Sequence, residues 1–354
     1  MAERIPVAIL GATGTVGQRF VQLLDGHPWF EVVALTGSAR SEGKPYAEAA
    51  TWLLDTPMPA WARTMTVLPT RADVVTRAGA RLAFSALPAS AARTVEPELA
   101  AAGVWVGSNA SAYRREPDVP LLMPEVNPDH IALVERQRRE RGWPAAIITN
   151  PNCTTTGLTV PLKALAHAFG LEAVMVVSLQ ALSGAGYPGV PSLAIMDNVI
   201  PYIPNEEDKV EWEPRKLLGS LRGDEVELAG VTISAHVHRV PVLDGHTLAV
   251  SVRLRTTASP DAVAEVLASY QAPEATRDLP SAPRPVMVVR HEPDRPQPRL
   301  DRMTGRGMTT VIGRVRPDPI LGIKFSVLSH NTIRGAAGGA LYNAEWLARY
   351  LGWR

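Results

Sequence analysis

The chain has a single cysteine, Cys153, among 354 residues. One cysteine cannot form an internal disulfide, and no cysteine cluster is present to hold zinc or to indicate another metal site. Apolar runs are strand-sized, far shorter than a membrane span. Neither positive nor negative charge is in excess, since the net charge is +1 and the arginines are scattered among acidic residues. The sequence therefore predicts no basic surface for binding nucleic acid.

No secretory signal is apparent, because the first four residues lead straight into a short apolar strand and a glycine turn. A reducing cytoplasm therefore fits the chain. Its apolar content of 46% and charged content of 20% are those of an ordinary globular protein. A chain of 354 residues is longer than a single hydrophobic core usually supports, so two domains are expected.

The first motif lies at residues 7–24. An apolar strand, Val7–Leu10, is followed by a glycine turn and then by a helix carrying Phe20 and Leu24. Strand, glycine turn and helix in this order are typical of a dinucleotide site: the glycines allow a tight turn, close approach of a pyrophosphate and helix packing. The candidate cofactor residues of the turn are Gly11, Thr13, Gly14, Thr15, Val16 and Gly17. The alternative is a glycine-rich loop without a ligand.

The second strand, residues 31–36, tests which nucleotide binds. An NAD site would carry an acid after it, whereas this chain has Ser38, Arg40 and Ser41. Hydroxyls and a guanidinium suit a 2′-phosphate, so NADP is predicted. A solvated surface arginine is the alternative.

Strands and helices then alternate as in a doubly wound sheet, with strands at 82–85 and 104–106 around a helix at 89–102. Ser85 lies at the carboxyl end of its strand, where ligands collect. Beyond residue 153 longer strands with turns are expected at 173–179, 233–242, 247–254, 286–289, 308–315 and 323–328. Residues 200–213 are acidic and are expected to be irregular, and 331–351 should form one helix that returns to the first domain.

Cys153 follows an apolar run and the turn Asn150-Pro151-Asn152, and it begins a helical pattern. Unpaired N–H groups and the helix dipole should lower the pKa of a thiol there and favour the thiolate. The alternative is a small buried hydrophobic residue.

A nucleophilic thiol needs a base, and eight histidines are available. His246 follows a turn glycine at a strand entrance, where side chains reach into clefts. His236 and His238 alternate with Arg239 in another strand. The adjacent Arg114 and Arg115 become candidates for an anion site only if their polar loop folds over Cys153.

Four strings together resemble aspartate-semialdehyde dehydrogenase of the archaeal and fungal-like branch. They are residues 11–17, Asn150-Pro-Asn-Cys-Thr154, Arg239-Val-Pro-Val-Leu-Asp-Gly-His-Thr247 and Arg334-Gly-Ala-Ala-Gly338. The likeness runs from residue 5 to about residue 350. It implies an α/β fold: a Rossmann-type NADP-binding domain (1–152, with helix 331–354 packing back on it) and an α+β catalytic and dimerisation domain (153–330), as in glyceraldehyde-3-phosphate dehydrogenase.

The activity implied is the NADP- and phosphate-dependent interconversion of L-aspartate 4-semialdehyde and 4-phospho-L-aspartate, on the route to lysine, threonine and methionine. The partners implied are this small substrate, inorganic phosphate and a second copy of the chain, in a homodimer or homotetramer.

The resemblance also implies roles for single residues. Cys153 is the nucleophile, His246 the general acid/base and Gln180 an orienting residue. Substrate and phosphate ligands are Arg239 for the α-carboxylate, Glu206 (with Glu207 not excluded) for the ammonium group, and Lys209, Arg114 and Asn152 for phosphate. Further cofactor contacts are Ser183, Gly184, Ala185, Gly186 and Asn331.

The chain departs from the family pattern in two places. Arg115 stands where an apolar residue is expected, which leaves open which arginine meets phosphate. His236 and His238 are either silent strand residues or tune the site. Two other functions stay open: an acyl-CoA reductase that uses the same thiol, for example on malonyl-CoA, and a nucleotide-binding protein without turnover.

Overall fold

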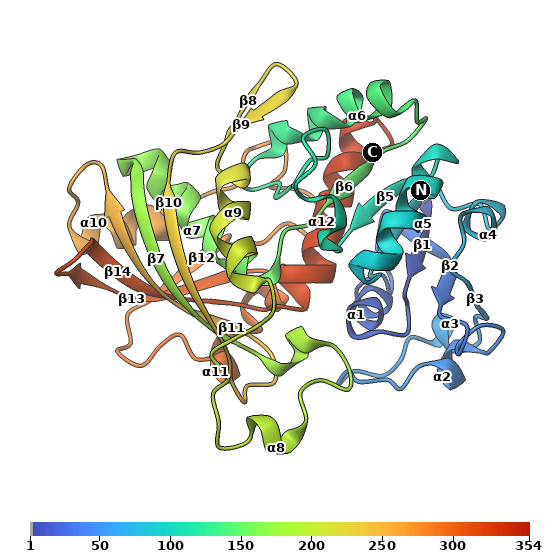
Figure 1. Cartoon of the computed structure of the whole chain (residues 1–354), viewed down its shortest axis with the longest axis horizontal. Coiled ribbons are helices and arrows are strands. Elements are labelled where there is room, and N and C mark those ends of the chain that lie inside the picture. Colours follow the sequence, from blue (N-terminus) through green and yellow to red (C-terminus); the bar gives the residue numbers. More distant parts are fainter. Residues whose placement is uncertain (1–2) are drawn as a thin grey trace.

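A computed structural model describes residues 3–354. Within them the chain builds two six-stranded sheets side by side (Figure 1). The strands of the first sheet are all parallel, in the order β3-β2-β1-β4-β5-β6. They are β1 (Ile5–Leu10), β2 (Phe30–Gly37), β3 (Val67–Pro69), β4 (Leu82–Ser85), β5 (Trp105–Ser108) and β6 (Ile147–Thr149). This order is that of the Rossmann fold, so the predicted fold class of the first domain is confirmed.

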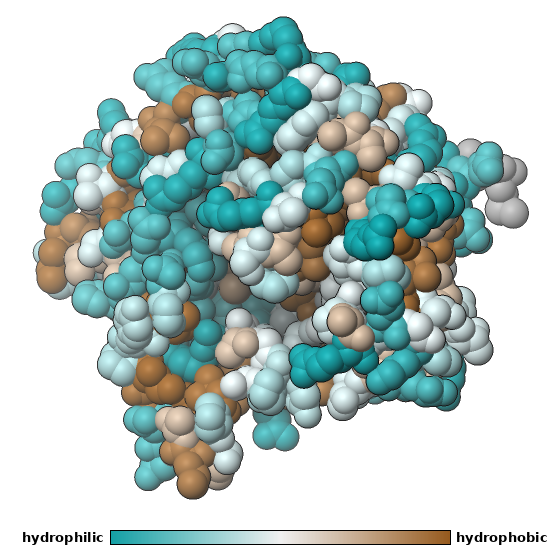
Figure 2. All heavy atoms as spheres, turned by 45° about the vertical axis from the view of Figure 1, so that its right-hand side comes forward, coloured by the Kyte–Doolittle hydropathy of each residue, from teal (hydrophilic) through white to brown (hydrophobic). Residues whose placement is uncertain are grey.

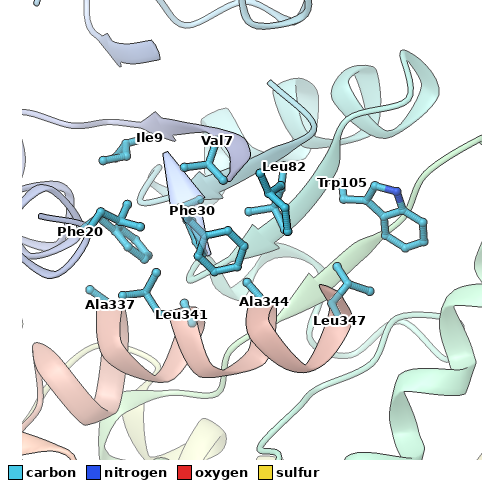
Figure 3. Packing of buried hydrophobic residues seen from close by; sticks show 14 of the residues in the cluster. Val7, Ile9, Phe20, Phe30, Leu82, Trp105, Ala337, Leu341, Ala344 and Leu347 are labelled. Carbon is cyan, nitrogen blue, oxygen red and sulfur yellow. The ribbon is translucent and has the colours of Figure 1, made fainter. Parts of the chain in front are cut away.

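Helices cover both faces of this sheet because its strands are apolar on both sides. The connecting helices are α1 (Thr15–Leu23), α2 (Tyr46–Ala49), α3 (Ala60–Arg63), α4 (Ala72–Arg77), α5 (Ala89–Ala101) and α6 (Leu133–Arg141). The C-terminal helix α12 (Gly338–Tyr350) lies against one face. Figure 3 shows its apolar residues Leu341, Ala344 and Leu347 packed below Phe30 and Leu82, in line with Ala337, which directly precedes the helix. The end of the chain therefore returns to the N-terminal sheet.

The segment 331–351 was predicted as one helix; this is confirmed for residues 338–350, while its start differs. A five-residue π-helix, η5 (Ile333–Ala337), precedes α12, and the chain before it is a turn. A π-helix has no distinctive hydrophobic period, so the sequence pattern could not reveal it.

The second sheet is mixed, in the order β10-β7-β11-β14-β13-β12. Its strands are β7 (Leu171–Gln180), β10 (Thr232–Arg239), β11 (His246–Leu254), β12 (Met287–Arg290), β13 (Thr310–Asp318) and β14 (Gly322–Ser329). One face packs on α7 (Cys153–Phe169), α9 (Glu206–Leu217) and α10 (Pro260–Ser269) in a continuous apolar core. On the opposite face Met175, Val177 and Leu179 of β7 are between 37% and 48% exposed. The sheet therefore presents an open apolar face.

Residues 200–213 were expected to be irregular, but α9 begins at Glu206. Its first turn carries Glu206, Glu207 and Asp208, and its last turn carries Arg215 and Lys216. Acids at the N-terminus and bases at the C-terminus both complement the helix dipole. The acidic run is thus the start of a helix.

The remaining elements are short. They are β8 (Ser220–Arg222) and β9 (Glu225–Glu227), which form a hairpin, α8 (Ser192–Ile195), α11 (Pro298–Asp301), and the 3-10 turns η1 (Ser111–Tyr113), η2 (Pro128–Ala132), η3 (Leu182–Ala185) and η4 (Thr304–Gly307). The segment around α8 projects from the body and carries exposed apolar residues, visible as brown spheres at the lower edge of Figure 2. No helix within residues 3–354 has the length and apolar character needed to cross a membrane.

Candidate active site

Cys153 is the first residue of α7, directly after the last strand of the parallel sheet. Asn152 caps this helix: its Oδ1 accepts hydrogen bonds from the N–H groups of Thr154 (2.9 Å) and Thr155 (3.1 Å). An asparagine in an extended conformation is a favoured cap, which explains why the helix starts here. Cys153 as a whole residue is partly exposed. This placement favours a reactive residue over a buried hydrophobic one.

His246 begins β11 in the second sheet, and its Nε2 lies 3.2 Å from Cys153 Sγ. The ring is buried, and its Nδ1 accepts the backbone N–H of Ala181 at 3.0 Å. In a neutral imidazole one nitrogen donates and the other accepts, so the bond from Ala181 assigns the ring proton to Nε2. His246 therefore points an N–H group at the sulfur.

The surroundings shift both groups away from an ion pair. Burial, together with the charge of Arg239 and of His330, lowers the pKa of His246 to about 3. Burial, followed by the negative charge of Glu206, raises the pKa of Cys153 to about 12, while Arg114 and Arg239 act in the opposite direction. The predicted lowering of the thiol pKa at a helix start was wrong for this structure. The reason is that desolvation of the thiolate outweighs the helix N-terminus.

Arg239 and Gln180 end two neighbouring strands, β10 and β7, and are paired in the parallel register. Arg239 Nη1 donates to the carbonyl oxygen of Ala181 at 2.6 Å, and Gln180 Nε2 to Ser178 Oγ at 3.2 Å. Both side chains are buried. A Cβ on Gly184 would lie 2.9 Å from Arg239 Nη1 and 3.2 Å from His246 Cε1, so a larger residue here would displace the guanidinium or the ring. The turn around Gly184 thus closes over the arginine and the histidine.

Glu206 approaches the site from the start of α9. Its Oε1 accepts from Asn152 Nδ2 at 2.8 Å, and its Oε2 lies 3.2 Å from Lys209 Nζ. Glu207 faces elsewhere, since its Oε1 accepts from the N–H of Val237. Of the two acids left open by the sequence, Glu206 is the one beside Cys153.

The two adjacent arginines have different surroundings. Arg114 is buried, and its guanidinium donates to Glu213 Oε1 (2.8 Å) and to the carbonyl oxygen of Asn109 (2.7 Å). Arg115 is half exposed, pairs with Asp208 at 2.6 Å and lies over the ring of Trp212. The loop thus folds over the site with Arg114 on the inside.

Sequence reasoning missed Glu213, which links these groups. It binds Arg114 through Oε1, and its Oε2 accepts the backbone N–H of Asn152 at 2.7 Å. The sequence does contain a spacing that points to Glu213. It follows Glu206 by seven residues, which places both side chains on one face of α9. That signal could be used only once residues 206–217 were recognised as a helix.

Comparison with known proteins agrees with this geometry. The model of the semialdehyde dehydrogenase NAD binding domain matches residues 6–134, and that of the semialdehyde dehydrogenase dimerisation domain matches residues 162–334. The chain is 52% identical to aspartate-semialdehyde dehydrogenase of Archaeoglobus fulgidus, with 98% of each chain covered. It is 47% identical to the Schizosaccharomyces pombe enzyme, with 96% of each covered. The chain belongs to the aspartate-semialdehyde dehydrogenase family.

Among solved structures, aspartate semialdehyde dehydrogenase with NADP from Candida albicans superimposes with a TM-score of 0.89 at 42% identity, covering 98% of each chain. The predicted family and the two-part fold, a Rossmann-type domain with an α+β domain, are confirmed. These relatives carry the dehydrogenase name, which does not favour the acyl-CoA reductase alternative.

The glycine turn has the features that a dinucleotide-binding member of the family needs. Gly11 has φ +72°, and a Cβ on Gly17 would lie 2.2 Å from the carbonyl oxygen of Gly11. Helix α1 is preceded by Gly14 and has no side-chain cap, so its first N–H groups remain available to an anion. Thr15 Oγ1 is buried without a hydrogen-bond partner. An uncapped helix start and an orphaned hydroxyl fit the pyrophosphate of NADP.

The other expected cofactor residues surround this turn. Thr13, Ser38, Arg40 and Ser41 line one cavity of about 410 Å³. Thr15, Ser183 and Gly186 line a neighbouring one of about 290 Å³. Val16 continues into the first turn of α1, and Ser85 ends β4. Asn331 donates to Ser183 Oγ at 2.8 Å, and Ala185 lies in the same exposed turn as Gly184.

His236 and His238 lie outside the site. Along β10 buried and exposed residues alternate, which places both histidines on the face opposite Arg239. They belong to the open face of the second sheet.

The hydrogen bonds of His246 generate a prediction on thiol reactivity. Because the ring stays neutral and the thiol pKa is raised, alkylation of Cys153 by iodoacetamide should rise roughly tenfold per pH unit from about pH 6 to about pH 9. Cys153 is the sole cysteine, so labelling is unambiguous. Urea-unfolded protein provides the reference curve of an unperturbed thiol. A pH-independent rate across the neutral range would instead show an imidazolium–thiolate pair.

Proposed function

We propose that the chain catalyses the NADP- and phosphate-dependent interconversion of L-aspartate 4-semialdehyde and 4-phospho-L-aspartate, in the biosynthesis of lysine, threonine and methionine. The observation that carries this proposal is the contact of 3.2 Å between Cys153 Sγ and His246 Nε2. Two buried arginines, Arg114 and Arg239, lie close enough to act on the thiol by their charge. An aldehyde oxidised to an acyl phosphate needs a thiol that attacks and later leaves, and cations for two anionic groups. The site supplies both.

Substrate binding follows from the charges around the thiol. Arg239 uses one N–H group on Ala181 and has further donors for a carboxylate. Glu206, held by Asn152, accepts the ammonium group, and Gln180 lies beside Arg239 to orient the substrate. An amino acid whose carboxylate and ammonium group meet Arg239 and Glu206 directs its aldehyde to Cys153.

Phosphate binding is assigned to Arg114, Lys209 and Asn152. Both cations are linked to Asn152 through a glutamate. Lys209 contacts Glu206, which accepts from the Asn152 side chain, and Arg114 pairs with Glu213, which accepts from the Asn152 backbone N–H. Arg115 pairs with Asp208 at the surface, which favours Arg114 for this role. The arrangement supports attack of phosphate on a carbonyl carbon bonded to Cys153.

In the proposed reaction Cys153 first releases its thiol proton to solvent. The thiolate then attacks the aldehyde carbon, and the carbonyl oxygen becomes an oxyanion. The Nε2–H group of His246 then stabilises the oxyanion of the thiohemiacetal. When bound, oxidised NADP supplies a positive charge that favours the thiolate and accepts the hydride. The resulting thioester is cleaved by phosphate, and Cys153 leaves as a thiolate. The family resemblance implies full proton transfer by His246, whereas its bond from Ala181 supports the role of a hydrogen-bond donor.

The function is tested by following NADPH formation from L-aspartate 4-semialdehyde and NADP. We expect turnover only when phosphate or arsenate is present, and a loss of roughly 10⁴-fold or more for Cys153→Ser, because an alcohol is a far weaker nucleophile. Cys153→Ser should fold normally, which circular dichroism checks. Turnover without phosphate, or NADPH oxidation by malonyl-CoA at a higher kcat/KM, would favour the acyl-CoA reductase.

We also propose that Ser38, Arg40 and Ser41 hold the 2′-phosphate of NADP. These residues line a cavity adjoining the glycine turn, and Arg40 is exposed with its guanidinium available. A planar cation with several donors suits a phosphate.

Arg40→Ala should raise the KM for NADP by roughly 10- to 100-fold, because one or two charge-assisted hydrogen bonds to the 2′-phosphate are lost. The KM for NAD, which lacks this phosphate, should stay unchanged. Arg63→Ala, an exposed arginine of the same domain, is the control. The KM for each cofactor is measured by steady-state kinetics. An equal rise in KM for NADP and for NAD would show that Arg40 does not bind the 2′-phosphate.

We infer that the chain is a homodimer or homotetramer. The matching dimerisation-domain model covers the second sheet, whose open face exposes Met175, Val177 and Leu179. Such a row of apolar side chains is typical of a surface that a partner covers. The same division supports a domain boundary near residue 152, with the C-terminal helix joining the first domain. A reduced catalytic thiol fits the cytoplasm as the location.

Val177→Asp should break this assembly, because it places a charge at the centre of the apolar row. Analytical ultracentrifugation at micromolar concentration should show dimers or tetramers for the parent and smaller species for the variant. Ile320→Asp, a change at an exposed residue between β13 and β14, is the control and should leave the mass unchanged. An unchanged mass for Val177→Asp would contradict the assigned interface.

A further inference from the structure

The π-helix η5 packs directly against the start of α7. A Cβ on Gly335 would lie 2.7 Å from Cys153 Cβ, 2.9 Å from its Cα and 3.2 Å from its carbonyl oxygen. Ordinary van der Waals contact begins at about 3.4 Å, so a methyl group does not fit unless one of the two segments moves. Gly335 therefore touches the backbone that carries the thiol.

The π-helix itself is held rigidly. Arg334 is fully buried and ion-paired with the buried carboxylate of Glu125. The Gly335 N–H donates to the carbonyl oxygen of His330 at 2.9 Å. The segment can thus not move away from α7 without straining a buried ion pair or a backbone hydrogen bond.

A second connection links η5 to the turn before Cys153. Asn150 Nδ2 lies 3.4 Å from the carbonyl oxygens of both Gly335 and Ala336. The same amide contacts Asn109 Oδ1 at 3.1 Å, and Asn343 Nδ2 donates to Asn150 Oδ1. Asn150, before Pro151-Asn152, is therefore hydrogen-bonded to the C-terminal segment, and Cys153, after it, packs against Gly335 of the same segment.

We propose that η5 is a positioning segment for the nucleophile and that Gly335 sets the location of Cys153 Sγ relative to His246. This inference rests on the proposed function, because it assigns the consequence of misplacement to that reaction. A π-helix widens the helical turn locally, which exposes the face of Gly335 to α7. The role belongs to a segment that is distant in sequence and does not itself meet the substrate.

The test is Gly335→Ala. Displacement of a reacting group by a fraction of an ångström to one ångström costs on the order of 10²-fold in rate. We expect kcat per folded molecule to fall by roughly that factor, with KM for the semialdehyde and for NADP changed less than about twofold. Alkylation of Cys153 should change rate in parallel, because the contact with His246 changes.

Gly219→Ala is the matched control. It creates a similar backbone clash, with a Cβ 2.5 Å from the carbonyl oxygen of Glu227, but at a peripheral hairpin. It should lower Tm and leave kcat per folded molecule unchanged. If Gly335→Ala folds poorly, Asn150→Ala provides the second variant, with an expected loss in kcat of roughly 3- to 10-fold at constant KM.

A kcat per folded molecule within twofold of the parent for both variants would overturn the proposal. The alkylation rate needs neither substrate nor cofactor, so it tests the positioning of Cys153 even if the parent shows no phosphate-dependent turnover. That separates failure of this inference from failure of the proposed function.

Discussion

The backbone of Ala181 holds the two groups on which the candidate site depends. Its N–H donates to His246 Nδ1, and its carbonyl oxygen accepts from Arg239. One peptide segment therefore determines which ring nitrogen carries the proton and where the guanidinium lies. Because Ala181 immediately follows β7, the rigidity of the second sheet passes directly to both side chains.

Asn152 has the corresponding role on the other side of the thiol. Its side chain caps α7 and reaches Glu206, while its N–H is bound by Glu213. These contacts join the parallel sheet, α7 and α9 at the residue before the nucleophile. The site is thus a junction of both sheets, and motion of either one changes the distance between sulfur and imidazole.

Burial decides the electrostatics. A thiol at a helix start, beside two arginines, would ordinarily be acidic, yet desolvation and Glu206 raise its pKa to about 12. The same burial keeps His246 neutral. The resting site is therefore a thiol facing an N–H donor.

The amino-acid sequence by itself determined the features that are local. The order of strand, glycine turn and helix at residues 7–24 predicts the nucleotide-binding sheet. The turn Asn150-Pro151-Asn152 and the helical pattern after it predict the helix that Cys153 begins. These signals need only neighbouring residues, since hydrogen bonding in a turn or helix cap spans a few positions. His246 was a candidate from its place at a strand entrance, and the family strings added its role and that of Arg239 by likeness.

Only the tertiary structure decided what depends on residues far apart in the chain. It distinguished Arg114 from Arg115 and Glu206 from Glu207, because burial and partners differ between neighbours of the same type. It reversed the expected pKa of Cys153 and brought in Glu213 and Gly335, which act through contacts across 61 and 182 positions. Desolvation and packing are set by the whole surrounding fold, and no short stretch of sequence contains them.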